Sequence, residues 1–313
     1  MPDHAPRAAD QAAAAAGLAT AVVVLMAGFA LIGVGVAGAG GAVAGIVVAA
    51  ALTAAGYAFC DRLALSAMRA RPVSEVEQPE LYRLVRELSK AGRLPVPRLF
   101  MSPAEQPNSF TVGRGPRTAT LCCTEGLLRV LDEAELRGVL GHELAHVSGH
   151  DILASSMSAG LATLITSPAR LVTLARRGFR SGGRPDGVPV AAPAGDGPGS
   201  GSRVGTAESL LLVVFGPIAA ILVRLAVSPE REYRADATAA LLTGDPVALS
   251  SALRKADAGA AELPLPPDGR RLSVGHLMLV DPFRPEGVAR LFAAHPPAGE
   301  RVRRLEALAG YRR

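Results

Sequence analysis

The first sixty residues have the apolar pattern of a membrane-spanning segment. Residues 11–60 contain no Asp, Glu, Lys or Arg. One span needs about 20 apolar residues, so this stretch is long enough for two spans joined by a tight turn. The glycine-rich run 38–41 suits that turn, and we predict a helical hairpin with arms at 17–37 and 42–60. The run Gly41-Ala42-Val43-Ala44-Gly45 offers small residues four apart, on which the two arms can pack.

The charges around the hairpin predict its orientation. Arg62, Arg69 and Arg71 follow the second arm, whereas the turn carries no charge. The positive-inside rule then places the turn on the translocated side and the chain after the hairpin in the cytoplasm. The alternative is a cleaved signal peptide, because Ala37-Gly38-Ala39 resembles a processing site. The apolar stretch before that site is longer than a signal core, which favours the hairpin.

Two further apolar stretches follow later in the chain. They run from Ile152 to Leu174 and from Ser209 to Val223, and each contains a proline. We predict that both span the membrane, with a buried or interfacial helix as the alternative for either. Residues 176–206 between them are rich in Gly, Pro and Ser, which predicts a disordered linker. Five arginines in this linker run against its external placement, and this conflict stays open.

The more polar segments predict an α+β domain. Residues 79–91 have the spacing of an amphipathic helix with a proline at its start. Three short strands are predicted at 96–101, 108–113 and 118–123, because turn-forming Pro and Gly residues separate them. We expect these strands to form a small antiparallel sheet, whose edge strand could bind an extended peptide.

A predicted helix after residue 131 carries the most informative motif. Asp132 and Glu135 have the spacing of a capping box, and apolar residues then recur at helical spacing. The second half of this helix contains His142-Glu143-Leu144-Ala145-His146. Residues four apart share one face of a helix, so both imidazoles can bind one zinc ion while Glu143 takes a proton from a water molecule on that ion. The alternative is an ordinary amphipathic helix without a metal ion. Such a helix would bury the unpaired Glu and His side chains at a cost of several kcal/mol.

A hydrolytic zinc site usually has a third protein ligand. His150 lies about 12 Å of helix rise beyond His142, too far to share its ion. Glu232 and Asp236 are four apart on a helix predicted from Ser228 to about Gly244. One carboxylate could bind the metal while the other accepts the ring N–H of a histidine ligand. The alternative for this segment is a solvated, charged helix start.

The composition argues against several other classes. Three cysteines cannot build a disulfide framework, and Cys122 and Cys123 are neighbours that would face opposite sides of a strand. The net charge of +5 is spread along the chain. No nucleic-acid-binding motif is present, and four Tyr with no Trp give few stacking residues. We therefore expect no nucleic-acid partner.

The order of these features resembles the HtpX-like membrane metalloproteases, gluzincins related to the CAAX prenyl endopeptidases. The resemblance covers nearly the whole chain. It departs from the family pattern at Ser109, where the family usually has Ala, and in the linker 176–206. After the hairpin, the matching motifs are Pro107-Asn108-Ser109-Phe110, His142-Glu143-x-x-His146, Glu232-x-x-x-Asp236 and His295-Pro296-Pro297.

The resemblance also implies a role for each residue of the site. One zinc ion per chain would be bound, and the oxyanion of the tetrahedral intermediate would meet a hydrogen-bond donor. The implied roles are His142, His146 and Glu232 as zinc ligands, Glu143 as general base, Asp236 as the partner that orients the first histidine, His295 with the support of Arg301 at the oxyanion, and Asn108 beside the substrate-binding edge strand.

Together these features predict a mainly helical α+β integral membrane protein, multi-pass in the cell membrane, with a zincin-type catalytic domain in the cytoplasm. The expected segments are the hairpin 1–62, the first catalytic part 63–151, the apolar part 152–227 and the second catalytic part 228–313. We predict a zinc endopeptidase that cleaves polypeptides, and the family resemblance implies substrates among misfolded or damaged membrane proteins. The alternatives are a regulatory protease with one dedicated substrate, and a non-catalytic zinc-binding sensor, whose closed site would need a fourth protein ligand.

Overall fold

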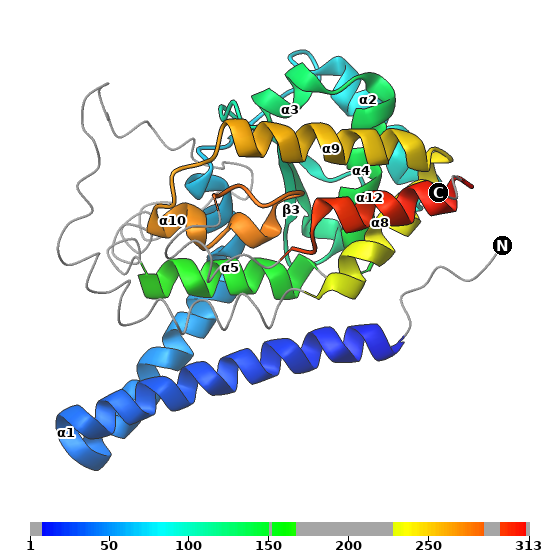
Figure 1. The fold of residues 1–313 in the computed structure, drawn as a ribbon. Helices are drawn as coiled ribbons and strands as arrows, with labels where there is room; N and C mark the ends of the chain where they lie inside the picture. Colours follow the sequence, from blue (N-terminus) through cyan, green and yellow to red (C-terminus); the bar gives the residue numbers. More distant parts are fainter. Residues whose placement is uncertain (1–7, 150–151, 167–227, 285–294, 311–313) are drawn as a thin grey trace, which may run out of the picture.

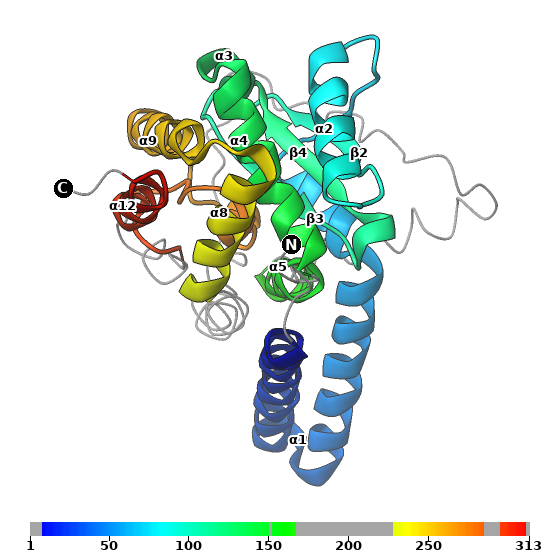
Figure 2. The same ribbon diagram turned by 90° about the vertical axis from the view of Figure 1, so that its right-hand side faces the viewer.

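The computed structural model describes residues 8–149, 152–166, 228–284 and 295–310 (Figure 1). A long helical hairpin projects from a domain in which helices pack around a small sheet (Figures 1 and 2). This arrangement confirms the mainly helical α+β class. His150, the linker 176–206 and the apolar stretch 209–223 lie outside the described residues.

Helix α1 (Ala8–Ala67) forms the hairpin, because its backbone leaves helical geometry at Ala37 and Gly38. Gly38 has a φ of +61°, which glycine adopts without a steric penalty. A Cβ atom on Gly41 would lie 1.9 Å from the carbonyl oxygen of Gly33, so the arms approach closely only because these residues lack side chains. Gly45 meets the carbonyl oxygen of Phe29 in the same way. The predicted hairpin, its turn and its glycine face are therefore present.

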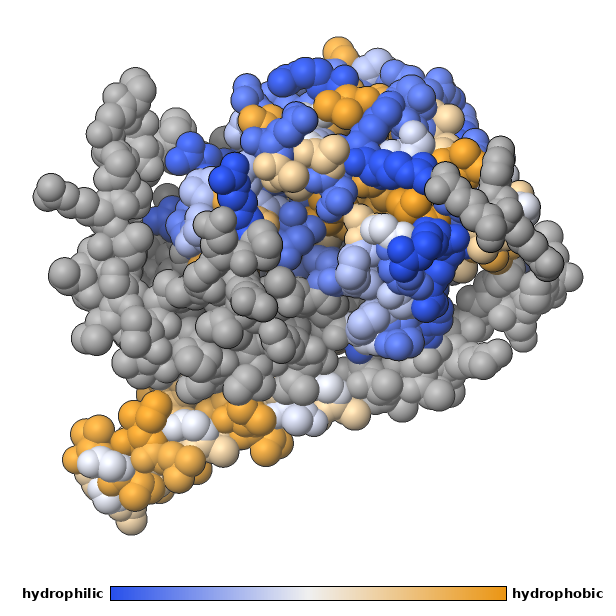
Figure 3. Space-filling view, viewed as in Figure 1, coloured by the Kyte–Doolittle hydropathy of each residue, from blue (hydrophilic) through white to orange (hydrophobic). Residues whose placement is uncertain are grey.

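The hairpin has the length and the surface of a membrane anchor. In Ala15–Ala67 the most apolar window has a mean hydropathy of 2.4. Large apolar side chains on it face outward, among them Leu31 and Val36 at 72% and 82% exposed, and hydrophobic residues cover its tip (Figure 3). Helix α5 (Ile152–Thr166) packs against α1, and the rest of the predicted span 152–174 lies outside the described residues. Within the described ranges, α1 is thus the one candidate span.

The sheet is mixed, so the prediction of an antiparallel sheet is wrong. Its strands are β1 (Arg71–Pro72), β2 (Arg98–Ser102), β3 (Ser109–Val112) and β4 (Thr120–Thr124), in the order β1-β2-β4-β3. β3 pairs antiparallel with β4, whereas β2 pairs parallel with β4. After β2 the chain skips one strand position and forms β3, and β4 then returns between the two. Periodicity places strands along the chain but carries no information on this order.

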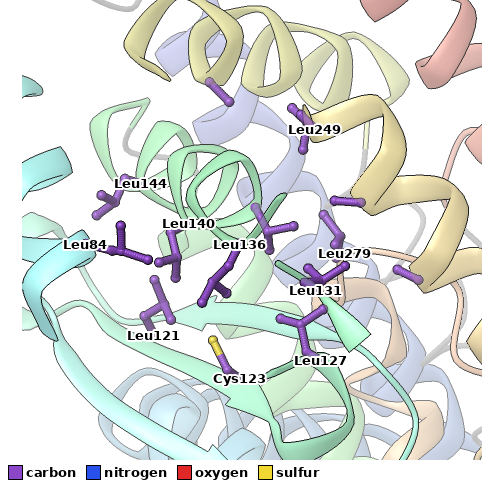
Figure 4. Close-up of a cluster of buried hydrophobic side chains, with 14 of the residues drawn as sticks. Leu84, Leu121, Cys123, Leu127, Leu131, Leu136, Leu140, Leu144, Leu249 and Leu279 are labelled. Atoms are coloured by element: carbon purple, nitrogen blue, oxygen red, sulfur yellow. The ribbon is translucent and has the colours of Figure 1, made fainter. Parts of the chain in front are cut away.

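The main core lies between the sheet and helix α4 (Glu133–Ser148), as Figure 4 shows. Asp132 and Glu135 form the predicted capping box at the start of α4. Cys123 belongs to this core and Cys122 to a second cluster on the other face of the sheet, as predicted. The remaining elements are α2 (Pro79–Ala91), η1 (Pro116–Thr118), α3 (Glu125–Val130), α8 (Pro229–Thr243), α9 (Pro246–Glu262), α10 (Gly269–Leu272), η2 (Gly275–Leu277) and α12 (Ala298–Leu308).

Candidate metal centre

Three side chains predicted to bind metal converge on one point. His142 and His146 stand one turn apart on α4, and their Nε2 atoms are 3.1 Å from each other. Glu232, in the first turn of α8, places its carboxylate oxygens 3.6 Å from Nε2 of His142 and 3.5 Å from Nε2 of His146. One ligand atom from each residue lies within 4.8 Å of the others. Two imidazoles and one carboxylate in this arrangement suit a zinc ion with an open fourth position.

Small residues allow α8 to cross α4 closely enough to form this cluster. A Cβ atom on Gly141 would contact Thr243 at 3.1 Å and Ala239 at 3.5 Å, both on α8. The face of α8 toward α4 also carries Ala235, which is buried. Gly138 lets α9 approach α4 in the same way, because its missing Cβ would lie 3.1 Å from Leu249. The ligands therefore sit where two helices with small contact residues meet.

Asp236 lies one turn after Glu232 and holds the first histidine. Its Oδ1 atom is 2.9 Å from Nδ1 of His142, which leaves Nε2 of that ring toward His146 and Glu232. Arg301 on α12 donates two hydrogen bonds to the Asp236 carboxylate, at 2.7 and 2.8 Å, and a third to the carbonyl oxygen of Leu279. Arg301 is only 1% exposed, and its guanidinium also lies 3.6 Å from Oε2 of Glu232.

The charges of the cluster suit a cation. Burial alone would raise the pKa of Glu232, but His146, His295 and Arg301 outweigh burial and hold that pKa well below its usual value. Burial also opposes ionisation of Asp236, yet Arg301 and His142 lower its pKa to about 2. Both carboxylates are therefore ionised at neutral pH, as metal binding and orientation of a histidine require.

The side chain of Glu143 points to the sheet, where two hydroxyl groups form hydrogen bonds with its carboxylate. Its oxygens accept hydrogen bonds from Oγ of Ser109 at 2.6 Å and from Oγ1 of Thr111 at 2.8 Å, both on β3. Burial raises the pKa of Glu143, and the neighbouring His142 and the two hydroxyls offset part of the rise. A buried carboxylate with a raised pKa next to two metal ligands is suited to accept and release a proton.

Sequence reasoning missed Ser109 and Thr111 as site residues. Residues two apart on a strand face the same side, so their spacing allowed a shared partner, but nothing in the chain identified that partner as Glu143. The one signal was the departure from the family pattern at Ser109.

His295 lies beside the cluster, close enough to Glu232 for an electrostatic contact. Its Nδ1 atom is 3.7 Å from Oε2 of Glu232, too far for a hydrogen bond. Both nitrogens are buried, and neither has a hydrogen-bond partner in the part of the chain that the structure describes. A buried ring without hydrogen-bond partners is costly, and the predicted role of this ring at a substrate oxygen stays a prediction.

Asn108 directly precedes β3, an edge strand of the sheet, and its role toward a substrate stays a prediction. Its amide nitrogen donates to the carbonyl oxygen of Val280 at 3.0 Å, and its side-chain oxygen accepts from the backbone N–H of Val280 at 3.3 Å. Leu279 donates its backbone N–H to the carbonyl oxygen of Ser109, and Met278 forms a bridge with Phe110. Part of the β3 edge expected to bind substrate is thus covered by residues 278–280.

Known proteins resemble this chain over most of its length. The model of "Peptidase family M48" matches residues 75–309. A "Protease HtpX homolog" of Kineococcus radiotolerans is 51% identical over 267 residues, which cover 85% of this chain and 86% of that protein. Proteins of the same description from Paenarthrobacter aurescens and Pelotomaculum thermopropionicum are 43% and 40% identical, over 92% and 81% of this chain and 92% and 84% of their own lengths.

Proposed function

This chain belongs to peptidase family M48 and is a metalloendopeptidase, and we propose that it cleaves polypeptides at one zinc ion held by His142, His146 and Glu232. The observation that carries the proposal is the convergence of these three ligands beside Glu143. When bound there, zinc would polarise the scissile carbonyl group and lower the pKa of the attacking water.

The side chains around the ligands have separate tasks. Glu143 takes a proton from the attacking water and delivers it to the leaving amine. His295 donates a ring N–H to the carbonyl oxygen as negative charge develops there. Arg301 acts through Asp236: its guanidinium fixes the carboxylate that orients His142, which supports a positioning role in place of contact with the oxyanion. Asn108 anchors residues 278–280 at the entrance of β3.

We also propose that the protein is a multi-pass protein of the cell membrane with its active site in the cytoplasm. Each arm of α1 is long enough to cross a bilayer, and Arg62, Arg69 and Arg71 follow the second arm. The apolar stretches 152–174 and 209–223 would add further spans. An active site beside such an anchor favours substrates among misfolded or damaged membrane proteins.

Metal removal tests the proposed activity. The detergent-purified full chain, loaded with zinc, should cleave a loosely folded protein such as casein. A chelator should stop cleavage and added zinc should restore it, because zinc is the group that would activate the carbonyl and the water at the three-ligand site. Added magnesium should not restore it, because magnesium demands octahedral oxygen coordination. Cleavage that continues after the metal has been removed would contradict the proposal.

The hydrogen bonds from Ser109 and Thr111 to Glu143 give a second prediction. Ser109→Ala combined with Thr111→Val should lower kcat about tenfold and leave KM unchanged, because the base loses its alignment. Loss of both hydroxyls should also raise the pKa of Glu143 further, and a base must be ionised to act, so the acid limb of kcat/KM should move to higher pH. Ser109→Thr combined with Thr111→Ser keeps both hydroxyls and should retain most activity. Equal losses in both double variants would indicate a packing effect only.

The unpartnered histidine gives a third prediction. His295→Ala should keep one zinc per chain and lower turnover by about 100-fold or more, as loss of an oxyanion donor does. His276 serves as the control, because it is also buried but bonds to the carbonyl oxygen of Ser155. His276→Gln should cost stability more than turnover per folded molecule. An unchanged rate in His295→Ala would remove His295 from the reaction.

A further inference from the structure

A hollow that the proposed reaction does not use lies beside the second arm of α1. Its volume is about 610 Å³, and its walls are Tyr57, Pro95 and residues 114–118 of the loop between β3 and β4. None of the ligands or catalytic residues lines it. The second arm of α1 rises from the hairpin toward the sheet, so the hollow lies where the membrane anchor meets the domain (Figure 2).

Two arginines give this hollow a positive charge. The guanidinium carbon of Arg114 is 5.6 Å from the centre of the Tyr57 ring, and Arg117 is exposed on the same loop. Neither side chain has a carboxylate partner among the described residues. Asp61, one turn after Tyr57, is already paired with Arg98 at 3.4 Å. The hollow therefore has two cations available to an anion.

The position of Tyr57 along the hairpin determines where the hollow lies relative to the membrane surface. From Gly38 at the turn to Tyr57, the helix rises about 28 Å at 1.5 Å per residue. This rise matches the hydrocarbon thickness of about 30 Å. Residues between these points expose apolar side chains, among them Val43 and Val47 at 64% and 61%. Tyr57 thus lies at the membrane–water boundary, where tyrosine is enriched, and Arg114 and Arg117 lie at the depth of the lipid phosphates.

We propose that this hollow binds the phosphate headgroup of an anionic phospholipid. A planar guanidinium group donates paired hydrogen bonds to phosphate oxygens, and two of them flank one hollow. The apolar face of α1 continues downward from Tyr57 and accommodates the acyl chains. The bound lipid fixes the height of the domain above the membrane. This inference rests on the membrane placement in the proposed function.

Native mass spectrometry of the full chain in detergent tests the site. The chain is titrated with phosphatidylglycerol or with phosphatidylcholine, and the apparent Kd for the first bound lipid is compared. The wild type should prefer phosphatidylglycerol. Arg114→Ala combined with Arg117→Ala should weaken phosphatidylglycerol binding by about fivefold per arginine, or about 25-fold in all, and leave phosphatidylcholine binding unchanged.

The matched control removes two arginines from α2, which lies at the far end of the domain from the hairpin (Figures 1 and 2). Arg83→Ala combined with Arg86→Ala changes the net charge equally and should keep the lipid preference. A wild type without preference, or an equal loss in the control, would overturn the site. Competition by inorganic phosphate as complete as competition by phosphatidylglycerol would show a site for free phosphate and overturn the lipid assignment.

The same samples separate this inference from the proposed function. The arginine double variant should cleave casein in detergent at the wild-type rate, because neither arginine belongs to the catalytic site. A wild type that alkaline carbonate extracts from phosphatidylcholine vesicles would contradict the membrane placement itself. A wild type that stays inserted but has no preference for phosphatidylglycerol would overturn the headgroup site alone.

Discussion

Glu143→Gln is expected to abolish cleavage of a loosely folded protein while zinc stays at one ion per chain. The glutamine has the size of the glutamate but cannot accept the proton of the attacking water. General-base catalysis contributes about 100-fold to 10,000-fold, so the rate should fall by about 1,000-fold. The ligand set remains intact, because Glu143 faces Ser109 and Thr111 and is not one of the three clustered ligands. Zinc content by atomic absorption, measured beside the cleavage rate, checks both parts.

Glu133→Gln is the matched control for this change. Glu133 lies on the same helix, its side chain is 53% exposed, and its surface ion pair with Arg83 contributes little to stability. This variant should cleave at the wild-type rate. Wild-type cleavage by Glu143→Gln would remove Glu143 as the base. Inactivity of the wild type itself, with zinc bound, would favour a dedicated substrate or a non-catalytic sensor.

The parts of the site that lie close together in sequence could be predicted from the sequence. His142, Glu143 and His146 follow from the geometry of one helical turn, and the capping box at Asp132 fixes where that helix begins. The hairpin was equally predictable, because uncharged length and a glycine-rich turn leave few other structures. Local periodicity is sufficient where one element contains the whole feature.

The parts that depend on packing could not be predicted from local pattern. Glu232 comes from α8, and only the family resemblance distinguished it from an ordinary charged helix start. The hydrogen bonds from Ser109 and Thr111 to Glu143 form only because β3 packs against α4. The hydrogen bond from the Asn108 amide to Val280 joins the start of β3 to a distant segment that has no periodicity. The sheet order is missed for the same reason, since strand order is set by long-range contacts.

Arg301 shows how far the site extends along the chain. Its guanidinium joins α12 to Asp236 on α8, and Asp236 in turn holds His142 on α4. A fully buried arginine is costly unless carboxylates and carbonyl groups satisfy it, and here both do. The candidate metal cluster is therefore supported in part by α12, which lies within the family match at residues 75–309.

Glu232→Ala is expected to remove zinc from the protein. The variant loses one of three ligands, and it also loses the negative charge that balances the cation. Loss of a supporting residue around a metal typically weakens binding 10-fold to 100-fold, so loss of a ligand should exceed about 100-fold. Cleavage should be lost together with zinc, and the zinc-dependent rise in Tm of the wild type should vanish, because a metal stabilises the folded state only by binding to it.

Two variants of the same helix distinguish a ligand from a neighbour. Asp236→Asn removes the carboxylate at Nδ1 of His142 but leaves all three ligands, so zinc binding should weaken by about 10-fold to 100-fold and persist at high zinc. Glu230→Ala removes an exposed carboxylate two residues before Glu232 and should bind zinc like the wild type. The expected order of zinc affinity is Glu230→Ala, then Asp236→Asn, then Glu232→Ala. Normal zinc content in Glu232→Ala, or a larger loss in Asp236→Asn, would transfer the ligand role to Asp236, since these are the two carboxylates that α8 brings to the histidines.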